Sequence, residues 1–274
     1  MATSSSDSQF RGRTVLITGA SLGVGRATAH AFHAAGANVA LIARRAGPLE
    51  EAAAGLKRAL ILPADVCDAN AMRDALATTV EHFGGLDGVV NNAGAHFRGP
   101  LEERSVDEIA TMVDVNLRAP LVLTCMALPY LRESSAGFVV NVASLAGKVP
   151  LDRAATYSAT KFGLRAFTYA MAQELKDSGI TVSVVSPGPI DTSFIMDELD
   201  EVEDIVFSQK MCSADDVAAM ILACARDGKV EREFPALGGL LATVGYLFPG
   251  IRQRLKPYLS EKGRKAKQRL REQR

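Results

Sequence analysis

The sequence predicts an α/β protein in which helices cover both faces of a single parallel β-sheet. Between residues 13 and 186, short runs of apolar or β-branched residues alternate with longer, Ala-rich segments of helical spacing. Several of the short runs are apolar throughout, which is typical of strands buried on both faces. The chain contains no internal repeat of solenoid length, so a doubly wound, Rossmann-type sheet is the expected architecture.

Strands and helices are expected to alternate along the chain. The strands are predicted at Thr14–Thr18, Asn38–Ile42, Ala59–Leu62, Gly88–Asn91, Phe138–Val142 and Thr181–Val185. The helices are predicted at Val24–Ala35, Gly47–Lys57, Ala69–Phe83, Val106–Leu131, Ala155–Ser178 and Ala214–Arg226, with N-caps at Ser105 and Ser213. Crossovers between parallel strands are expected to be right-handed.

Length and composition favour one domain, because 274 residues of which 48% are hydrophobic bury a large core. We expect a flexible N-terminus at 1–10, the α/β domain at 11–233, and an apolar segment with a basic tail at 234–274. The basic residues from Lys262 onward are expected to be mobile, since few apolar neighbours accompany them. Deletion of everything after Ser260 is therefore expected to leave folding intact.

The charged and metal-ligating residues exclude several classes of function. Basic and acidic residues number 31 each, so no overall positive field favours a nucleic-acid partner. The cysteines are far apart and form no CxxC pair, and His30 and His33 lack a third ligand, so no metal site is expected. Unpaired cysteines and the absence of a secretory signal pattern favour a cytoplasmic location.

A glycine-rich turn follows the first predicted strand. The segment Thr18-Gly19-Ala20-Ser21-Leu22-Gly23-Val24-Gly25 leads directly into a helix. Glycines there let the backbone approach a pyrophosphate, which would lie at the positive end of the helix. The motif alone also suits an ordinary strand-to-helix turn.

The second predicted strand ends in a pair of arginines. A site for NAD usually carries an acidic residue at this point, whereas here the chain has Arg44 and Arg45. Guanidinium groups suit a 2′-phosphate, so NADPH or NADP+ is the expected cofactor and NADH the second choice. An isolated arginine pair could equally lie free in solvent.

Three polar residues further along form a candidate catalytic set. Tyr157 and Lys161 are four residues apart in a predicted helix and so share one face. A cationic Lys161 is expected to lower the pKa of Tyr157, which would then serve as general acid or base. Ser144, at the end of the preceding strand, is expected to hydrogen-bond the substrate oxygen.

Taken in order, these motifs resemble the short-chain dehydrogenases/reductases. The glycine turn is similar to the family's TGxxxGxG loop, Asn91-Asn92-Ala93-Gly94 to its NNAG element, and Ser144, Tyr157 and Lys161 to its catalytic residues. The resemblance extends from the first strand to Thr192. One departure is Leu22, where NADP-dependent members often have a basic residue.

The resemblance implies an enzyme that transfers a hydride between NADP(H) and a ketone, an aldehyde or the corresponding alcohol. It adds Asn116 to the catalytic residues as the anchor of a water molecule. The cofactor residues that it implies, together with the glycine loop and the arginines, are Gly19, Ser21, Leu22, Gly23, Gly25, Arg44, Arg45, Asp65, Val66, Asn92, Ala93, Gly94, Tyr157, Lys161, Pro187, Gly188 and Thr192.

The substrate is expected outside the carboxyl ends of the strands. Candidate pocket residues are His96, Phe97, Leu145 and Ile195, and 189–211 resembles the family's variable substrate lid. The apolar run Phe234–Gly250 is too short to span a membrane. It is expected to cap a lipophilic pocket or pack on a second subunit, with peripheral contact to anionic lipid as the less favoured alternative.

The helices at Val106–Leu131 and Ala155–Ser178 are the ones that pair in the family, so a homodimer or homotetramer is expected. Two other functions stay open. An epimerase or dehydratase would use the same cofactor site, and a sensor or scaffold would bind NADP without turnover. The joint presence of Asn116, Ser144, Tyr157 and Lys161 favours the reductase.

Overall fold

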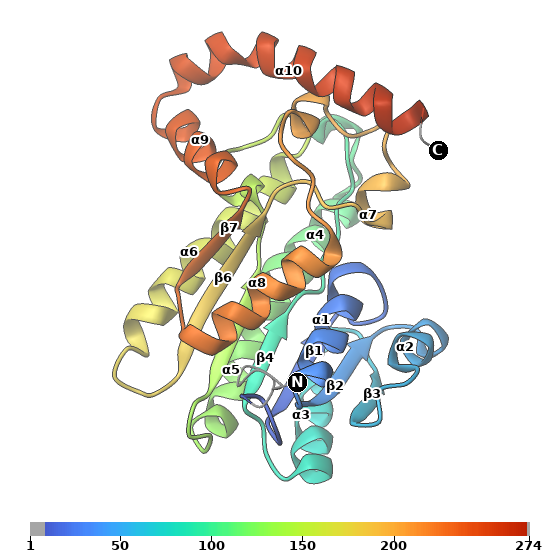
Figure 1. The fold of residues 1–274 in the computed structure, drawn as a ribbon, viewed down its shortest axis with the longest axis vertical. Helices are drawn as coiled ribbons and strands as arrows, with labels where there is room; N and C mark the ends of the chain where they lie inside the picture. The colour runs from blue at the N-terminus through green and yellow to red at the C-terminus, as the bar shows by residue number, and fades with distance from the viewer. Residues whose placement is uncertain (1–8, 273–274) are drawn as a thin grey trace, which may run out of the picture.

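The computed structural model describes residues 9–272, which form one doubly wound α/β domain. Its sheet has seven parallel strands in the order β3-β2-β1-β4-β5-β6-β7 (Figure 1). The strands are β1 (Thr14–Thr18), β2 (Asn38–Ala43), β3 (Ala59–Pro63), β4 (Gly88–Asn91), β5 (Phe138–Val142), β6 (Thr181–Pro187) and β7 (Glu231–Phe234). The predicted fold is confirmed, and β7 is an addition to the six predicted strands.

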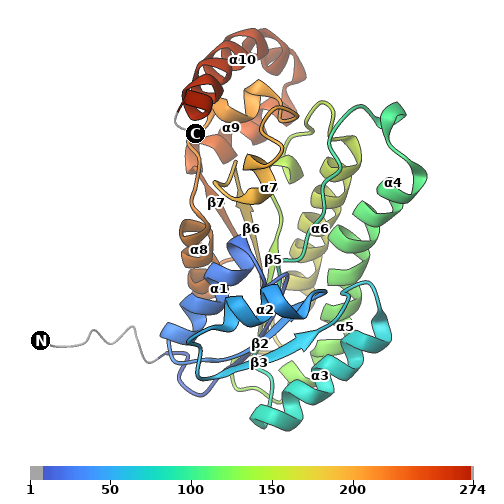
Figure 2. The ribbon, with the colours of Figure 1, turned by 90° about the vertical axis from the view of Figure 1, so that its right-hand side faces the viewer.

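Helices form a layer on each face of the sheet (Figure 2). One layer contains α1 (Gly23–Ala34), α2 (Ala46–Ala53) and α8 (Ala214–Asp227). The other contains α3 (Ala69–Phe83), α4 (Val106–Val113), α5 (Ala119–Leu131) and α6 (Ala155–Glu174). Each layer buries its apolar residues against the strands, which is the usual way in which a parallel sheet is stabilised.

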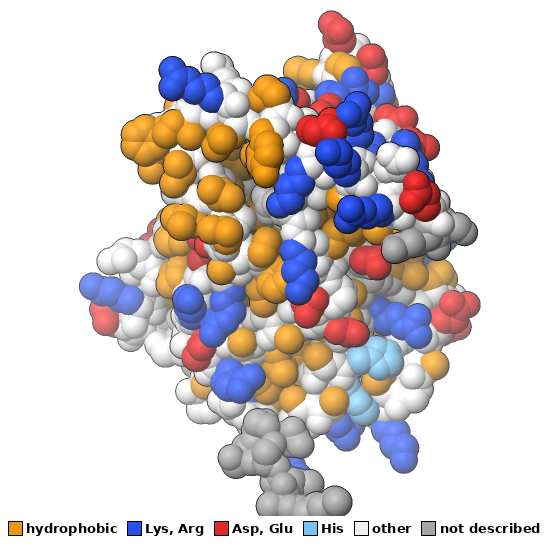
Figure 3. All heavy atoms as spheres, turned by 45° about the horizontal axis from the view of Figure 1, so that its top comes forward, with side chains coloured by type: hydrophobic (Ala, Val, Ile, Leu, Met, Phe, Trp, Pro, Cys, Tyr) orange, Lys and Arg blue, Asp and Glu red, His pale blue; other side chains and the backbone are white. Residues whose placement is uncertain are grey.

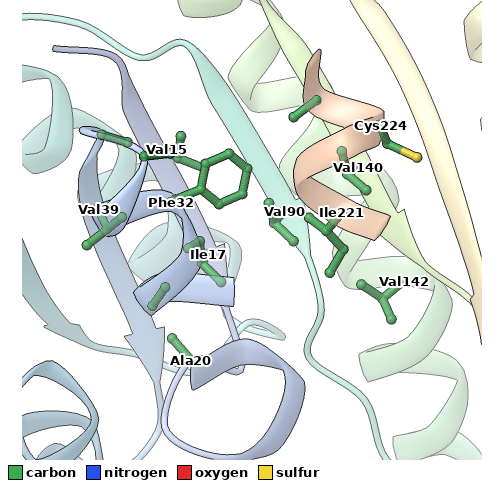
Figure 4. Packing of buried hydrophobic residues seen from close by; sticks show 14 of the residues in the cluster. Val15, Ile17, Ala20, Phe32, Val39, Val90, Val140, Val142, Ile221 and Cys224 are labelled. Atoms are coloured by element: carbon green, nitrogen blue, oxygen red, sulfur yellow. The ribbon is translucent and has the colours of Figure 1, made fainter. Parts of the chain in front are cut away.

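The core on the α1 side reaches into the predicted N-terminal tail. Figure 4 shows Phe32 of α1 and Ile221 of α8 among the valines of the central strands. Phe10 is 1% exposed, and its ring meets that of Phe32 edge-on at 5.1 Å between centroids. The prediction of a flexible segment at 1–10 is therefore wrong at Phe10, because aromatic packing fixes it. Residues 1–8 lie outside the described residues.

The helix predicted at Val106–Leu131 is interrupted by a π turn at Asp114–Arg118. Pro120 has no N–H to donate to the carbonyl group of Asn116, so the regular bonding pattern fails at this point. By length and composition alone the whole run could cross a membrane. In this fold it packs on β4, β5 and α6 instead.

The C-terminal part forms a cap over the carboxyl ends of the strands (Figure 1). It comprises α7 (Ser193–Met196), a 3-10 turn at Asp204–Ser208, α9 (Ala236–Leu247) and α10 (Pro249–Glu272). The expectation that residues from Lys262 onward are mobile is wrong for 262–272, which belong to α10, and residues 273 and 274 lie outside the described residues. Gly263 and Lys267 of α10 are buried against the lid, and Lys267 Nζ donates to the carbonyl oxygen of Val202 at 2.7 Å.

Candidate active site

The glycine-rich turn is fixed by close backbone packing. Gly19 has a φ of +64°, and a Cβ there would lie 2.9 Å from the Cα atom of Ala93. A Cβ on Gly25 would overlap the carbonyl oxygen of Gly19. Only glycine satisfies both constraints without strain. The turn thus presents bare backbone at the end of β1.

The Asn92–Gly94 segment braces this turn from β4. Asn92 Nδ2 donates to the carbonyl oxygens of Thr18 at 2.9 Å and Gly19 at 3.2 Å. Thr18 Oγ1 accepts from the backbone N–H groups of Asn92 and Ala93. These bonds hold the ends of β1 and β4 in register, so the predicted NNAG element supports the glycine turn directly.

The start of α1 is free to receive an anion. Its N-cap residue, Leu22, makes no side-chain cap bond, and the first turn contains no acidic residue. The unpaired N–H groups and the helix dipole therefore favour a negatively charged group at this position. The methyl group of Thr192 lies 3.4 Å from where a Cβ of Gly23 would be, which places Thr192 beside the turn.

Arg44 and Arg45 follow β2 on the same edge of the sheet. Both are exposed, and within residues 9–272 neither forms an ion pair with an acidic side chain. A small hollow at the carboxyl ends of β1 and β4 is lined in part by Thr18, Val66 and Ala93. Asp65 is exposed in the loop after β3, and its carboxylate accepts from the Cys67 N–H at 2.9 Å.

Asn116 lies on the π turn and links two parts of the site. Its Oδ1 atom accepts from the Ala95 N–H at 2.8 Å, and its Nδ2 atom donates to the Ala95 carbonyl oxygen at 2.8 Å. Nδ2 also contacts Thr160 Oγ1 on α6 at 3.3 Å. The side chain is 1% exposed. The π turn therefore positions Asn116 between the β4 loop and the helix that carries the tyrosine and lysine.

Tyr157, Lys161 and Ser144 converge at the carboxyl end of β5. The Lys161 ammonium group lies 5.7 Å from the centroid of the Tyr157 ring and donates to the Val142 carbonyl oxygen at 2.9 Å. Ser144 is the N-cap of the 3-10 turn at Leu145–Gly147, and its Oγ accepts from the Ala146 N–H at 3.1 Å. The three predicted catalytic side chains therefore meet in one place.

Burial controls the protonation of this cluster. Desolvation lowers the pKa of Lys161 to about 8. Desolvation also raises the pKa of Tyr157, while the Ser144 hydroxyl and the Arg98 charge oppose the rise. The pKa of this tyrosine is thus raised overall, against the expected lowering, because burial outweighs the neighbouring groups that favour the phenolate. Tyr157 is therefore a neutral proton donor at neutral pH.

His96 covers the ring of Tyr157. The two rings are stacked, with centroids 4.0 Å apart and planes 13° apart. Burial, Arg98 and Lys161 together lower the pKa of His96 to about 3, so the imidazole is neutral. Its Nδ1 atom lies 2.9 Å from Arg98 Nη1, and its Nε2 atom is buried without a partner within residues 9–272. Since Arg98 is the donor, Nε2 carries the proton.

Arg98 ties this loop to the lid and was not predicted from the sequence. Its Nε donates to Glu198 at 2.8 Å and its Nη2 to the carbonyl oxygen of Phe194 at 2.9 Å. The Phe194 ring lies 6.3 Å from that of His96. No local motif marks these residues, because the contacts join positions about a hundred residues apart.

The other predicted pocket residues have different surroundings. Leu145 is buried beside Ser144, and Phe97 lines a small hollow against Tyr157. Ile195 packs into an apolar cluster of the lid, which also includes Leu199, Val202 and Phe207. Pro187 ends β6, and the Gly188 N–H donates to the Phe234 carbonyl oxygen at 2.7 Å.

Similar proteins place this geometry in a family. Residues 13–203 match the model of the family described as short chain dehydrogenase. An uncharacterized oxidoreductase of Staphylococcus epidermidis is 36% identical over 181 residues, which cover 66% of this chain and 79% of that protein. The dehydrogenase/reductase SDR family member 7B of Rattus norvegicus is 34% identical over 69% of this chain and 61% of that protein.

Solved structures agree with the sequence comparisons. A short chain dehydrogenase from Burkholderia cenocepacia in complex with NADP has a TM-score of 0.75 at 30% identity, over 82% of this chain and 97% of that one. A 3-ketoacyl-(acyl-carrier-protein) reductase from Brucella melitensis complexed with NADH has a TM-score of 0.77 at 26% identity, over 82% and 98%. The predicted family, and with it an enzyme class that uses a nicotinamide dinucleotide, is confirmed. The chain belongs to the short-chain dehydrogenase family.

Proposed function

We propose that this protein is an NADP(H)-dependent oxidoreductase that interconverts a ketone or aldehyde and the corresponding alcohol. The observation that carries the proposal is the convergence of Ser144, Tyr157 and Lys161 at the sheet edge that also holds the glycine-rich turn. Such a cluster supplies a proton donor, a hydrogen bond to the substrate oxygen and a buried cation within one site.

The residues present fit a dinucleotide. The turn at Gly19–Gly25 and the uncapped start of α1 would hold its pyrophosphate, and Val66 would border its adenine ring. When bound, the nicotinamide supplies or accepts the hydride. Two neighbours of this fold bind NADP and NADH respectively.

The chain's own residues would handle the substrate oxygen and its proton. Ser144 would donate a hydrogen bond to the carbonyl oxygen, and Tyr157 would give that oxygen its proton as hydride reaches the carbon. Lys161 lies close enough to stabilise the phenolate that remains. Asn116 would keep the β4 loop aligned with α6 during this transfer.

A panel of ketones and aldehydes tests the reaction class. We expect NADPH oxidation with some carbonyl compounds, and NADP+ reduction with the matching alcohols. An epimerase or dehydratase would change its substrate without net consumption of NADPH, and a sensor would bind NADPH with no turnover at all. Either of those results would overturn the proposal.

The preference for NADP is proposed from Arg44. Its guanidinium is exposed after β2 and has no acidic partner within residues 9–272, as capture of a 2′-phosphate requires. We expect Arg44→Asp to lower the affinity for NADPH at least about tenfold and to raise the affinity for NADH. A carboxylate repels the 2′-phosphate and accepts hydrogen bonds from the ribose hydroxyls. Fluorescence titration with both cofactors measures this. The control is Lys57→Asp, which changes another exposed cation. An unchanged cofactor preference in Arg44→Asp would indicate that Arg45, not Arg44, binds the 2′-phosphate.

We also propose that the protein forms at least a dimer through α6. Four alanines on this helix, at 155, 159, 166 and 170, are exposed, and small side chains permit close helix packing. Light scattering tests the assembly, and a monomeric mass would contradict it.

We also propose a cytoplasmic location. The four cysteines are free, which fits a reducing compartment.

A further inference from the structure

The C-terminal cap exposes an unusually apolar surface. Figure 3 shows hydrophobic side chains gathered at one corner of the molecule, over α9 and the start of α10. We call this surface the apolar platform. Its members are each between 43% and 70% exposed: Leu237, Leu240, Leu241, Tyr246, Leu247, Phe248, Ile251, Leu255 and Tyr258. So many large apolar side chains in one patch mark an interaction surface.

The way in which α9 packs explains this exposure. Its buried residues are small ones, Gly238, Gly239 and Ala242. A Cβ on Gly238 would overlap Gln209, and a Cβ on Gly239 would overlap Glu233. The helix therefore lies close to the domain through its smallest residues and turns its leucines outward. A surface helix of a globular domain has the opposite arrangement.

The outer face of α10 changes from apolar to cationic along its length. Ile251, Leu255 and Tyr258 lie on its first half, and Lys262, Lys265 and Arg269 continue the same exposed face at helical spacing. The whole helix has nine basic and two acidic residues. Four other cations, at 252, 256, 267 and 271, bond to residues outside the helix instead, so the exposed row is separate from the cations that anchor the helix.

We propose that the apolar platform and this cationic row dock on the surface of an anionic lipid bilayer. An apolar patch and a basic row together provide two attractive contributions, and stable peripheral binding usually needs both. Tyr246 and Tyr258 suit the boundary between lipid and water, because each has an apolar ring and a polar tip. A second copy fits this surface less well, since a two-fold contact would bring two cationic rows together.

Co-sedimentation with vesicles tests docking independently of any enzymatic activity. We expect the protein to bind vesicles of equal parts phosphatidylcholine and phosphatidylglycerol, to bind phosphatidylcholine alone far more weakly, and to lose affinity as salt is added. The triple variant Lys262→Glu, Lys265→Glu and Arg269→Glu should bind more than about tenfold more weakly. The triple variant Leu240→Ser, Leu247→Ser and Phe248→Ser should lose binding at every salt concentration.

A matched control removes the same net charge elsewhere. Lys57→Glu, Arg132→Glu and Lys176→Glu are exposed changes far from the apolar platform and should leave vesicle binding near wild type. All three variants should keep the melting temperature, because none of the altered side chains is buried. Equal loss in the charge variant and the control would overturn the proposal. So would an apolar variant that keeps vesicle binding but reduces the molecular mass in light scattering, because the platform would then join two copies of this chain.

Discussion

The two ends of the candidate active site are held together in different ways. At the cofactor end, the critical contacts are made to backbone atoms: the Asn92 side chain donates to the carbonyl oxygens of Thr18 and Gly19, and Gly25 packs against the Gly19 carbonyl group. At the substrate end, side chains far apart in sequence make them, as when Arg98 bonds to Glu198. The first end tolerates almost no change in shape, whereas the second depends on individual charges.

The two ends therefore differ in how far their geometry can be adjusted by single substitutions. The backbone at Gly19 and Gly25 leaves no room for a Cβ atom, so the shape of the dinucleotide end is fixed by these glycines. Side-chain bridges can be exchanged one at a time at modest cost, which lets a lid be adapted to different substrates. Substitutions at the two ends should therefore differ in size of effect.

The largest effect is expected at the glycine turn. In Gly25→Ala the new methyl group would overlap the Gly19 carbonyl oxygen, so the turn must move away from the start of α1. We expect NADPH affinity to fall by more than about a hundredfold, or the fold to be lost. Gly47→Ala on α2 is the control, because its Cβ meets nothing within 4 Å. Binding within a few-fold of wild type in Gly25→Ala would show that the turn is not rigid.

A largely buried carboxylate at the start of β7, Glu231, should give an intermediate effect. Burial alone would raise the pKa of Glu231, but bonds from Arg165, Tyr169 and Ser186 lower it to about 2. Because the folded pKa lies below the unfolded one, this stabilisation is fully present above pH ~4.5 and is lost as the pH falls toward about 2. We expect Glu231→Gln to cost about 1–3 kcal/mol at neutral pH.

Urea unfolding at several pH values measures that cost. The gap between wild type and Glu231→Gln should narrow as the pH drops below about 4.5. Glu261→Gln on α10 is the matched control, since its carboxylate is more exposed and, among the described residues, pairs with Arg264 and Lys265 of its own helix. A gap that stays constant with pH would contradict the ion-pair account.

The smallest effect is expected from the lid bridge. Arg98→Ala removes the bonds to Glu198, to the Phe194 carbonyl oxygen and to His96 Nδ1. We expect KM for the carbonyl substrate to change by up to about tenfold, with NADPH affinity unchanged. Steady-state kinetics on any substrate found in the panel measure both. A parallel loss of NADPH affinity would show that the two ends of the site are coupled.

The same contrast decides which features could be predicted from the sequence. The strands β1 to β6 and the glycine turn follow from local patterns of apolar residues and glycines. β7 does not, because it lacks the run of apolar residues that predicts a buried strand. It contains Glu231, which pairs with Arg165, and Glu233, which pairs with Lys148. The outward direction of the α9 leucines could not be predicted either, because only the fold shows that Gly238, Gly239 and Ala242 form the buried face of this helix.

The stacking of His96 on Tyr157 and the docking of α10 on the lid could not be predicted from local sequence either. Both join segments that are distant in the chain and carry no motif. The π turn at Asn116 was missed because its cause, Pro120, also suits the first turn of a helix.

The central claim is that Tyr157 is the proton donor. Measuring both the turnover and the NADPH affinity of Tyr157→Phe tests this claim most directly. The change removes one hydroxyl and keeps the ring that packs against His96. We predict that turnover falls by about a hundredfold or more while the NADPH dissociation constant stays within a few-fold of wild type. Turnover close to that of the wild type, with cofactor binding intact, would show that Tyr157 is not the proton donor and would contradict the account.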